Sequence, residues 1–536
     1  MDEILARMTT EQKVGQLFVV YFADPHFSTA LEEMITRYHI GGIIIFGRNL
    51  TSLPDLANLI NQAQNAAVGT EPGVPLFVAT DQEGWPVLRL VQGGTIFPSA
   101  MAVGATGSVM DAQLMASTMA AEMTAVGINM NLAPVMDVNS NPANPIIGIR
   151  SFGSSAELVS ELGTVMIEAY QAQGIVTTAK HFPGHGDTSI DSHLSLPVIT
   201  HDLARVESVE LAPFRAAIPA GVDCIMTAHI SVPALDPVPG RPATLSEPVL
   251  QGLLREQMGF EGLIASDSLG MRAVTDQYDV ATAAALAFQA GADLLMFGDD
   301  PGHDPSEQRP AYERVLQLVQ EGRVPMSRLD DAVRRILLVK ARRGILDWEP
   351  VIVDRIAEKV GTAEHLAAAR QVALDSITLV RDDEGLLPLD PESGLLVVYP
   401  SGGESLAQAV ERHGSHVRAL EVGVRPSQAE IEEVAAQAAG VDAVVLGTVN
   451  VQRYPEQVEL VEALQNSKAL VTVALSSPYD FLSYPQVLTY LTTYGQAPVA
   501  MEALAEVLFG LAGPRGRLPV ELPGLYAVGD GLVGSR

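Results

Sequence analysis

Cysteine is almost absent from this sequence. Among its 536 residues Cys224 is the single cysteine, so the chain can form no internal disulfide and no cysteine-rich metal site. No apolar run approaches the ~18 residues that a membrane helix requires, and we therefore expect no membrane association. The first residues lack a basic segment followed by an apolar one, so no export signal is visible and a cytoplasmic location is expected.

Positive charge is also scarce. The chain has 33 lysines and arginines against 64 acidic residues, which gives a formal charge of −31 and a pI near 4.6. An acidic surface repels a phosphate backbone, so nucleic acid is excluded as a partner. The sequence contains neither solenoid repeats nor a glycine-rich phosphate loop, and a nucleotide-binding role therefore has little support.

Short apolar runs bounded by turn residues are abundant, and they alternate with helix-length amphipathic stretches. This rhythm predicts a parallel α/β architecture. Eight runs precede residue 300, which is the strand number of a TIM (β/α)8 barrel. The predicted strands are residues 16–22, 41–47, 75–80, 128–135, 174–179, 223–228, 262–266 and 293–298.

A second, shorter rhythm follows in the C-terminal part of the chain. We expect a TIM-barrel domain over residues 1–346, a linker over 347–372 and an α/β sandwich domain over 373–536. The smaller domain is predicted to be an open sheet covered by helices on both faces. Its predicted strands are residues 394–400, 416–423, 442–447, 469–477 and 487–495.

Ionisable residues follow most of the first eight runs. Because the active sites of TIM barrels collect at the carboxyl ends of the strands, these residues are expected to share one rim. Each one alone could be a helix cap or part of a loop ion pair, but the joint pattern indicates a site. The residues are Asp81, Arg89, Asp137, Arg150, Lys180, His181, His229, Asp267, Asp299 and Asp300.

The stretch "KHFPGHGDTSIDSH", residues 180–193, holds three of the 11 histidines and allows three interpretations. A loop metal site could use His181, His185, His193 and Asp187, although the proline and glycines make a continuous metal-binding helix improbable. A second interpretation is a polar loop whose histidines are simply hydrogen-bonded. The third is a proton-transfer site, in which a carboxylate orients an imidazole.

The proton-transfer interpretation depends on Asp191 and His193. In an extended segment, residues two apart point to the same side, so these two side chains can touch while Ser192 faces away. A carboxylate beside an imidazole fixes its tautomer and stabilises its protonated form, which suits a general acid/base near neutral pH. The proline and glycines before the pair would let the loop move over a bound substrate.

This stretch, together with "DQEG…LRL", "RSFG", "TAHI", "GLIASDSLGM", "ITLVRDDEGLLPL" and "LFGLAGPRGRLPVELP", closely resembles the family 3 glycoside hydrolases. The histidine-rich loop is similar to that of the β-N-acetylhexosaminidase branch specifically. The resemblance runs in order from about residue 8 to residue 525 and includes the second domain that some members lack.

The resemblance implies a retaining exo-β-N-acetylglucosaminidase that acts on peptidoglycan- or chitin-type glycans, without a metal or cofactor. Asp267 would be the nucleophile that forms a glycosyl-enzyme ester, and His193 would be the general acid/base, oriented by Asp191. The substrate would be an amino-sugar oligosaccharide or glycoside. The residues that the resemblance assigns to holding its non-reducing sugar are Asp81, Arg89, Arg150, Lys180 and His181.

Three positions depart from the family pattern. Trp85 and Pro86 stand where a glycine and a polar residue are common, and Trp85 is expected either to stack beside the pocket or to pack beneath it. Ser268 follows the predicted nucleophile where many members carry aspartate. That change is expected to alter the rate or the acceptor preference.

Other functions remain open on the sequence. A phosphorylase would use the same residues with phosphate as acceptor, because a histidine that has given up its proton does not repel an anion. A broad β-glucosidase generally lacks the Asp-x-His loop. A silent sugar-binding relative would lack Asp267 or the Asp191–His193 pair, all of which are present. The sequence does not indicate an oligomeric state.

Overall fold

The first eight strands form one parallel sheet that curls into a ring. In this computed structural model, which describes residues 1–465, 467 and 469–534, the strand order is β7-β6-β5-β4-β3-β2-β1-β8, and a parallel bridge between Ala265 and Leu294 joins the two ends. The eight strand predictions from the sequence are therefore confirmed. The strands are β1 Phe18–Val20, β2 Gly42–Ile45, β3 Phe77–Thr80, β4 Met130–Asn131, β5 Val176–Phe182, β6 Cys224–Thr227, β7 Leu263–Ala265 and β8 Leu295–Met296.

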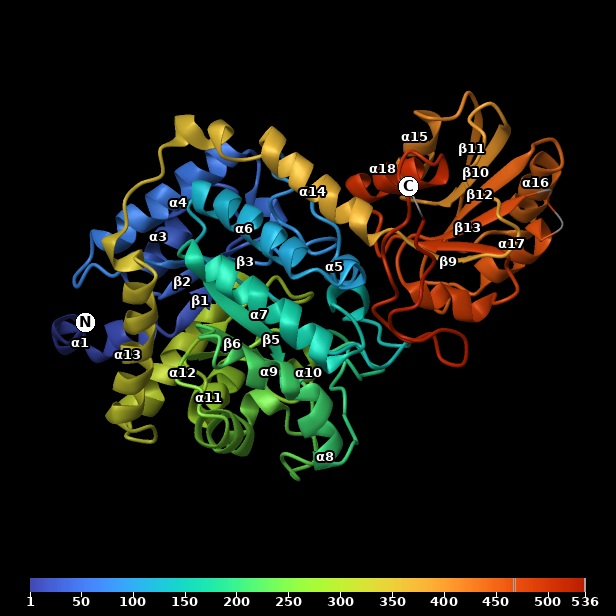
Figure 1. Cartoon of the computed structure of the whole chain (residues 1–536). Coiled ribbons are helices and arrows are strands. Elements are labelled where there is room, and N and C mark those ends of the chain that lie inside the picture. The colour runs from blue at the N-terminus through green and yellow to red at the C-terminus, as the bar shows by residue number, and fades with distance from the viewer. Residues whose placement is uncertain (466, 468, 535–536) are drawn as a thin grey trace.

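Helices surround this barrel on the outside (Figure 1). Their apolar faces bury against strands that are themselves buried on both sides, as the continuous apolar runs indicate. A π-helical segment, Pro248–Gln257, takes the place of a regular helix between β6 and β7. The α-helices are α1 Asp2–Arg7, α2 Thr10–Gly15, α3 Thr29–Thr36, α4 Leu53–Val68, α5 Ala100–Thr106, α6 Val109–Ala125, α7 Ala156–Ala172, α8 Leu203–Arg205, α9 Ala212–Ala217, α10 Arg272–Thr275, α11 Val280–Ala290, α12 Gln308–Gln320 and α13 Met326–Arg342.

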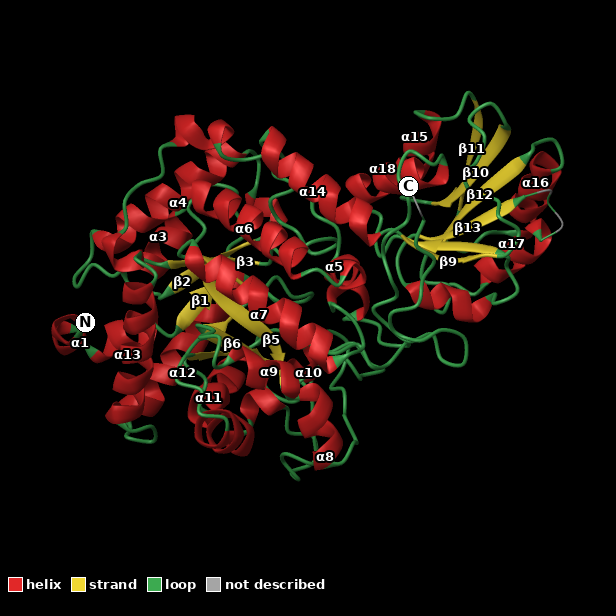
Figure 2. Ribbon diagram, in the orientation of Figure 1, coloured by secondary structure: helices red, strands yellow, loops and turns green. Residues whose placement is uncertain are grey.

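The C-terminal part is a six-stranded mixed sheet with the order β11-β10-β12-β13-β14-β9. Five of its strands were predicted and run parallel; β9 was not predicted and pairs antiparallel with β14 at the edge. Separate apolar clusters line the two faces of the sheet, and helices cover both (Figure 2). The strands are β9 Thr378–Asp382, β10 Gly394–Pro400, β11 His416–Val422, β12 Ala443–Thr448, β13 Leu470–Ala474 and β14 Thr489–Thr492, and the helices are α15 Glu404–Glu411, α16 Gln428–Ala438, α17 Glu456–Leu464 and α18 Pro498–Leu508.

Helix α14, Ala363–Ser376, connects the two parts and runs through the boundary expected at residue 372. The C-terminal domain, which we call the second domain, packs beside the loops that follow β3 and β4. The Ser154 amide donates to the Pro519 carbonyl at 3.0 Å, and the Asn139 side chain meets the Tyr479 hydroxyl at 3.5 Å. These contacts place the smaller domain next to the rim of the barrel where the site was expected.

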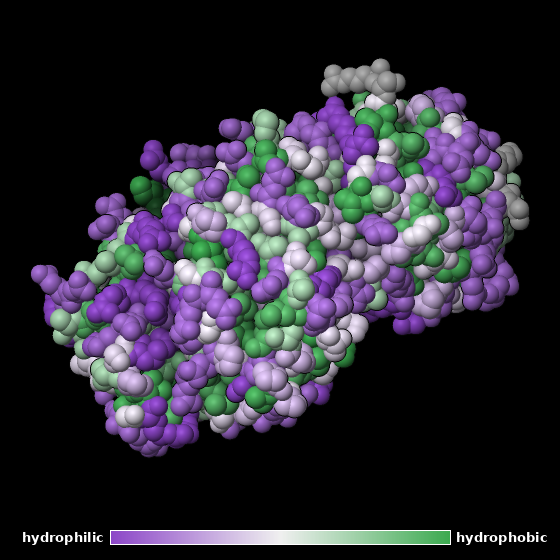
Figure 3. Space-filling view, turned by 60° about the horizontal axis from the view of Figure 1, so that its bottom comes forward, coloured by the Kyte–Doolittle hydropathy of each residue, from purple (hydrophilic) through white to green (hydrophobic). Residues whose placement is uncertain are grey.

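The face in Figure 3 is covered largely by hydrophilic residues, with hydrophobic residues in small groups between them. Among the residues that the structure describes, no helix combines the length and the apolar character needed to cross a bilayer.

Candidate active site

A pocket of about 570 Å³ opens at the carboxyl ends of the barrel strands. Its lining includes the apolar side chains of Ile44, Leu132, Met226 and Met296. All of the predicted site residues line this pocket except Asp191, which touches one that does. The described part of the second domain contributes no lining residue, so the pocket belongs to the barrel.

Five charged side chains form one network on the side of the pocket nearest β3, β4 and β5. We call Asp81, Glu83, Arg89, Arg150 and Lys180 the ion-pair cluster. The Lys180 ammonium lies 2.8 Å from an Asp81 oxygen and 2.7 Å from a Glu83 oxygen. Arg150 donates two hydrogen bonds of 2.8 Å to Glu83, while Arg89 pairs with Asp81 at 3.3 Å. The contacts of Lys180 and Arg150 join segments that are far apart in the sequence, whereas Arg89 and Asp81 lie in the same segment after β3.

Burial and charge act against each other in this cluster. Burial alone would raise the pKa of Glu83, but Arg150 and Lys180 hold that pKa well below its ordinary value. Burial would likewise lower the pKa of Lys180, and the carboxylates of Asp81 and Glu83 raise it instead. Glu83 and Lys180 are therefore held in their ionised forms, and the cluster presents fixed donors and acceptors to a ligand.

Glu83 is the residue that the sequence analysis missed. Its side chain is 4% exposed and is shared by Arg150 and Lys180, two of the predicted sugar-binding residues. The available signal was its position two residues after Asp81, in "DQEG", directly after a predicted strand. A carboxylate there is the counter-charge that the predicted cations require.

Asp267, the predicted nucleophile, follows β7 at the edge of the pocket. Burial would raise its pKa, but the neighbouring His181 and His229 imidazoles and the Ser268 amide hold it below the ordinary value. The Ser268 amide donates to Asp267 at 2.7 Å. His229 is fixed by Thr244 and donates from Nε2 to the Ser268 carbonyl, each at 2.8 Å. Asp267 is therefore held as a carboxylate, the form that a nucleophile needs.

Ser268 connects Asp267 to a third carboxyl group. Its hydroxyl donates a short hydrogen bond to Asp300 and accepts one from the Gly298 amide at 2.7 Å. Burial, reinforced by the charge of Asp267, raises the pKa of Asp300 to about 6 despite the bond from Ser268. Ser268 thus holds an acid that titrates near neutral pH beside the predicted nucleophile.

Asp191 and His193 lie on the long loop that follows β5, residues 183–199, which we call the dyad loop. The Asp191 carboxylate accepts from both the backbone amide and the Nδ1–H of His193, each at 2.8 Å. The sequence analysis expected an extended segment, and this was wrong, because the Leu194 amide closes a turn onto the Asp191 carbonyl. The turn still brings the two side chains together.

The hydrogen bond from His193 to Asp191 raises the pKa of His193, against the opposing effect of burial. The carboxylates of Asp267 and Asp300 act in the same direction. Because Nδ1 is engaged by Asp191, Nε2 is the nitrogen that is free to exchange a proton. The His193 side chain is 46% exposed, so it can reach a group bound in the pocket.

The other histidines of the stretch are held by protein groups. One oxygen of Asp137 accepts from His181 Nδ1 at 2.7 Å, and the other accepts from the His185 amide at 2.7 Å. His185 contacts Thr188 through Nδ1 at 2.8 Å and Ser192 through Nε2 at 3.0 Å. Asp137 and His185 therefore organise the start of the dyad loop.

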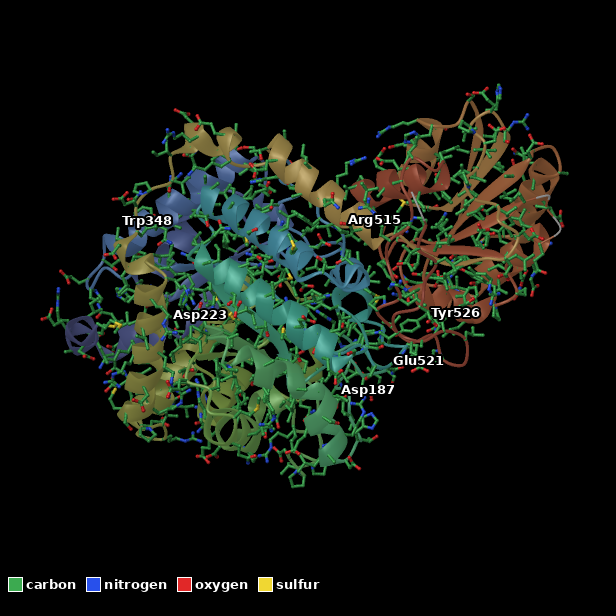
Figure 4. All side chains as sticks on the ribbon, viewed as in Figure 1. Asp187, Asp223, Trp348, Arg515, Glu521 and Tyr526 are labelled. Carbon is green, nitrogen blue, oxygen red and sulfur yellow. The ribbon has the colours of Figure 1, made fainter. Side chains whose placement is uncertain are left out.

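Asp187, the carboxylate of the metal interpretation, lies at the rim of the barrel (Figure 4). It makes a short contact with His201 and accepts from the Ser140 hydroxyl at 3.0 Å. Within the described ranges, no three histidine, cysteine, aspartate or glutamate side chains are placed to share a metal ion. Asp187 thus ties the dyad loop to neighbouring loops.

Trp85 packs against the second domain and does not line the pocket, so it forms no stacking platform there. A methyl group added to Gly495 would come within 2.7 Å of Trp85 Cδ1, so the ring lies directly on that backbone. Pro86 does line the pocket. Since Glu83 is two residues away, Trp85 anchors one side of the ion-pair cluster to the second domain.

Comparisons with known proteins agree with this geometry. Residues 9–339 match the glycosyl hydrolase family 3 N-terminal domain. A beta-hexosaminidase A of Pseudoalteromonas piscicida is 30% identical over 96% of this chain and 97% of its own length. A beta-N-acetylglucosaminidase/beta-glucosidase of Cellulomonas fimi is 32% identical over 96% and 94%. The solved structure of a family 3 beta-N-acetylglucosaminidase from Paenibacillus sp. FPU-7 superposes with a TM-score of 0.91 at 38% identity, covering 96% of this chain and 99% of the other.

Proposed function

The chain belongs to glycosyl hydrolase family 3, and from this premise we propose that it is a retaining exo-β-N-acetylglucosaminidase. It would release terminal non-reducing N-acetylglucosamine from peptidoglycan- or chitin-type glycans. The observation that carries the proposal is that the Asp191–His193 pair and Asp267 meet at one pocket, opposite the ion-pair cluster. Apolar side chains share the lining with these polar groups, as is usual in pockets that bind small molecules.

In the first step, the Asp267 carboxylate attacks the anomeric carbon while His193 Nε2–H protonates the leaving oxygen. His193 enters this step as the imidazolium, with Nδ1–H bonded to Asp191, and becomes neutral when its Nε2 proton leaves with the aglycone. In the second step His193 takes a proton from water, which attacks the glycosyl-Asp267 ester and restores the carboxylate. The two inversions together retain the β configuration.

The ion-pair cluster would bind the sugar ring. Asp81 offers acceptor oxygens to hydroxyl groups, while Arg89, Arg150 and Lys180 offer donors to hydroxyl and acetamido oxygens. Because these groups are already held by one another, they lose little freedom when a sugar binds. A sugar that lacks a matching hydroxyl group would leave buried charges without a partner, which is a source of specificity.

Phosphate is a second candidate acceptor, and the identity of the acid/base favours it. After the first step His193 is neutral, and Arg89 lines the same pocket. An anionic acceptor would therefore meet less repulsion from His193 than it would from a carboxylate serving as the acid/base. In that case the enzyme would release a sugar 1-phosphate.

Initial rates on p-nitrophenyl β-N-acetylglucosaminide and on the matching β-glucoside, each with and without inorganic phosphate, would test the proposal. We expect faster cleavage of the N-acetylglucosaminide and free N-acetylglucosamine, released as the β anomer, as the main product. A faster rate on the glucoside would contradict the substrate assignment. A sugar 1-phosphate as the main product would identify a phosphorylase instead.

A further inference from the structure

Ser192 differs from both of its neighbours in the dyad loop. Asp191 and His193 have side chains that are 23% and 46% exposed, whereas Ser192 is only 2% exposed. The far end of the loop is fixed separately, through paired backbone bonds of 2.9 Å between Ser231 and the segment at residues 197–199. Between that point and β5, Ser192 is where the apex of the loop meets the body of the barrel.

Ser192 makes two contacts in different directions. Its hydroxyl lies 3.0 Å from His185 Nε2, and its carbonyl accepts from the Ala273 amide at 3.2 Å. Ala273 belongs to α10, which begins five residues after Asp267. Ser192 therefore joins the loop that carries His193 to the segment that follows Asp267.

The hydrogen bonds around His185 determine which way its bond to Ser192 runs. The Thr188 hydroxyl donates to the His185 carbonyl at 3.0 Å, so it must accept the bond from His185 Nδ1. A neutral imidazole with its hydrogen on Nδ1 has a free acceptor at Nε2, which takes the hydroxyl hydrogen of Ser192. Burial lowers the pKa of His185 to about 4, which agrees with a neutral ring.

His185 is in turn fixed by Asp137, whose other carboxylate oxygen holds His181. Asn144 adds a bond of 2.9 Å to the His185 carbonyl. A chain of short contacts thus runs from a predicted sugar-binding histidine, through Asp137 and His185, to Ser192 at the apex of the dyad loop.

We propose that Ser192 and His185 are positioning residues that dock the dyad loop and aim His193 at the leaving oxygen. The proposal rests on the function proposed above, in which His193 is the general acid. Anchoring Ser192 fixes the backbone of the turn that the Leu194 amide closes onto the Asp191 carbonyl, and His193, which lines the pocket, projects from that turn. The same anchor couples the orientation of the acid to the residues that hold the sugar.

Loss of this anchor should affect proton delivery and leave sugar binding intact. A misplacement of about 1 Å at a reacting group costs roughly 100-fold in rate. p-Nitrophenolate leaves with little protonation, whereas a sugar leaving group requires it. The matched substrates are therefore p-nitrophenyl β-N-acetylglucosaminide and N,N′-diacetylchitobiose.

Ser192→Ala should lower kcat on diacetylchitobiose roughly 10- to 100-fold and on the p-nitrophenyl substrate much less, with KM little changed. His185→Gln should give the same pattern, and the double variant should be no worse than His185→Gln alone, because both remove one contact. Ser195→Ala is the control, since that serine lies three residues further along the loop and makes no side-chain hydrogen bond in the described structure.

His193→Ala separates failure of this inference from failure of the proposed function. If His193→Ala slows both substrates equally, His193 is not the acid and the proposed function fails. If His193→Ala is selective for diacetylchitobiose but Ser192→Ala matches Ser195→Ala, the docking role is wrong and the function stands. Equal losses on both substrates for Ser192→Ala and His185→Gln would show a merely structural role. If Ser192→Ala does not fold, His185→Gln decides the question alone.

Discussion

The ion-pair cluster and the dyad loop face each other across one pocket, yet they are held in opposite ways. Lys180 in the cluster is 2% exposed and pairs with two carboxylates from another segment, whereas His193 in the loop is 46% exposed and pairs with the neighbouring Asp191. The cluster can bind a sugar without rearranging, which limits the entropy lost on binding. The loop keeps the proposed acid accessible, and the hydrogen bond to Asp191 raises the pKa of His193, so that it holds the proton to be transferred.

Asp267 lies between the two regions, and its removal should have the largest effect. Asp267→Ala deletes the carboxylate proposed to form the covalent intermediate, so kcat should fall roughly 10⁴-fold or more. The fold should persist, because the side chain lies at the pocket edge. Kinetics on the p-nitrophenyl substrate, with circular dichroism as the folding check, measure both. Substantial remaining activity in a folded variant would assign the nucleophile elsewhere.

Glu83→Gln tests whether the ion pairs of Glu83 with Arg150 and Lys180 are what hold the ion-pair cluster in place. The variant leaves Arg150 and Lys180 buried with one carboxylate fewer, which should cost about 3 kcal/mol in the free energy of unfolding. KM should rise for substrates with good and poor leaving groups alike, because the sugar is common to both. Denaturant unfolding and steady-state kinetics measure these two effects.

Glu71→Gln is the matched control for that variant, since Glu71 pairs with Arg7 at an exposed position. Exposed ion pairs contribute little, so stability and KM should hardly change. If Glu83→Gln behaved like this control, the ion-pair cluster would not be what fixes the sugar site.

Asp191→Asn tests whether the loop sets the pKa of its own acid. The bond to the Asp191 carboxylate raises the pKa of His193, so the wild-type enzyme keeps the catalytic proton to higher pH. Without that charge the pKa falls, and the basic limb of the pH profile of kcat/KM should move to lower pH. Asp187→Asn is the control, because Asp187 lies in the same loop but pairs with His201. An unmoved basic limb in Asp191→Asn would exclude His193 as the group that titrates there.

Trp85→Ala should have the smallest effect on the kinetics. We expect it to disturb the ion-pair cluster and to leave the dyad loop unchanged. Loss of the contact with the second domain should loosen the loop that carries Glu83, raising KM by a few-fold and lowering the melting temperature. The preference between leaving groups should stay unchanged. Trp348→Ala is the control, because Figure 4 places Trp348 on the side of the barrel away from the second domain. Altered leaving-group dependence in Trp85→Ala would mean that the two regions are not independent.

The sequence predicted the two regions unequally. The barrel strands were readable because each is buried on both faces and therefore appears as an apolar run between turns. The rim residues followed from the rule that strand ends collect active-site groups. The edge strand β9 was missed because its apolar run is short: it ends in Arg381 and Asp382, which are only partly buried.

Contacts between residues that are far apart in the sequence could not be predicted from sequence patterns. Glu83 matters because of Arg150 and Lys180, which come from other strands and meet it only after the barrel closes. Ser192 reads as a spacer between Asp191 and His193 until its contacts with His185 and Ala273 are seen. The roles given to Asp267, His193 and the cluster remain predictions that the experiments above address.

The most direct test of the central claim is the mass of the protein after reaction with a slow-turnover fluorinated N-acetylglucosaminide. The account predicts a covalent adduct of one sugar, located by peptide mapping on Asp267 and absent from Asp267→Ala. An adduct on another residue would contradict it. So would turnover without any adduct that releases the α anomer, because a retaining double displacement requires the ester.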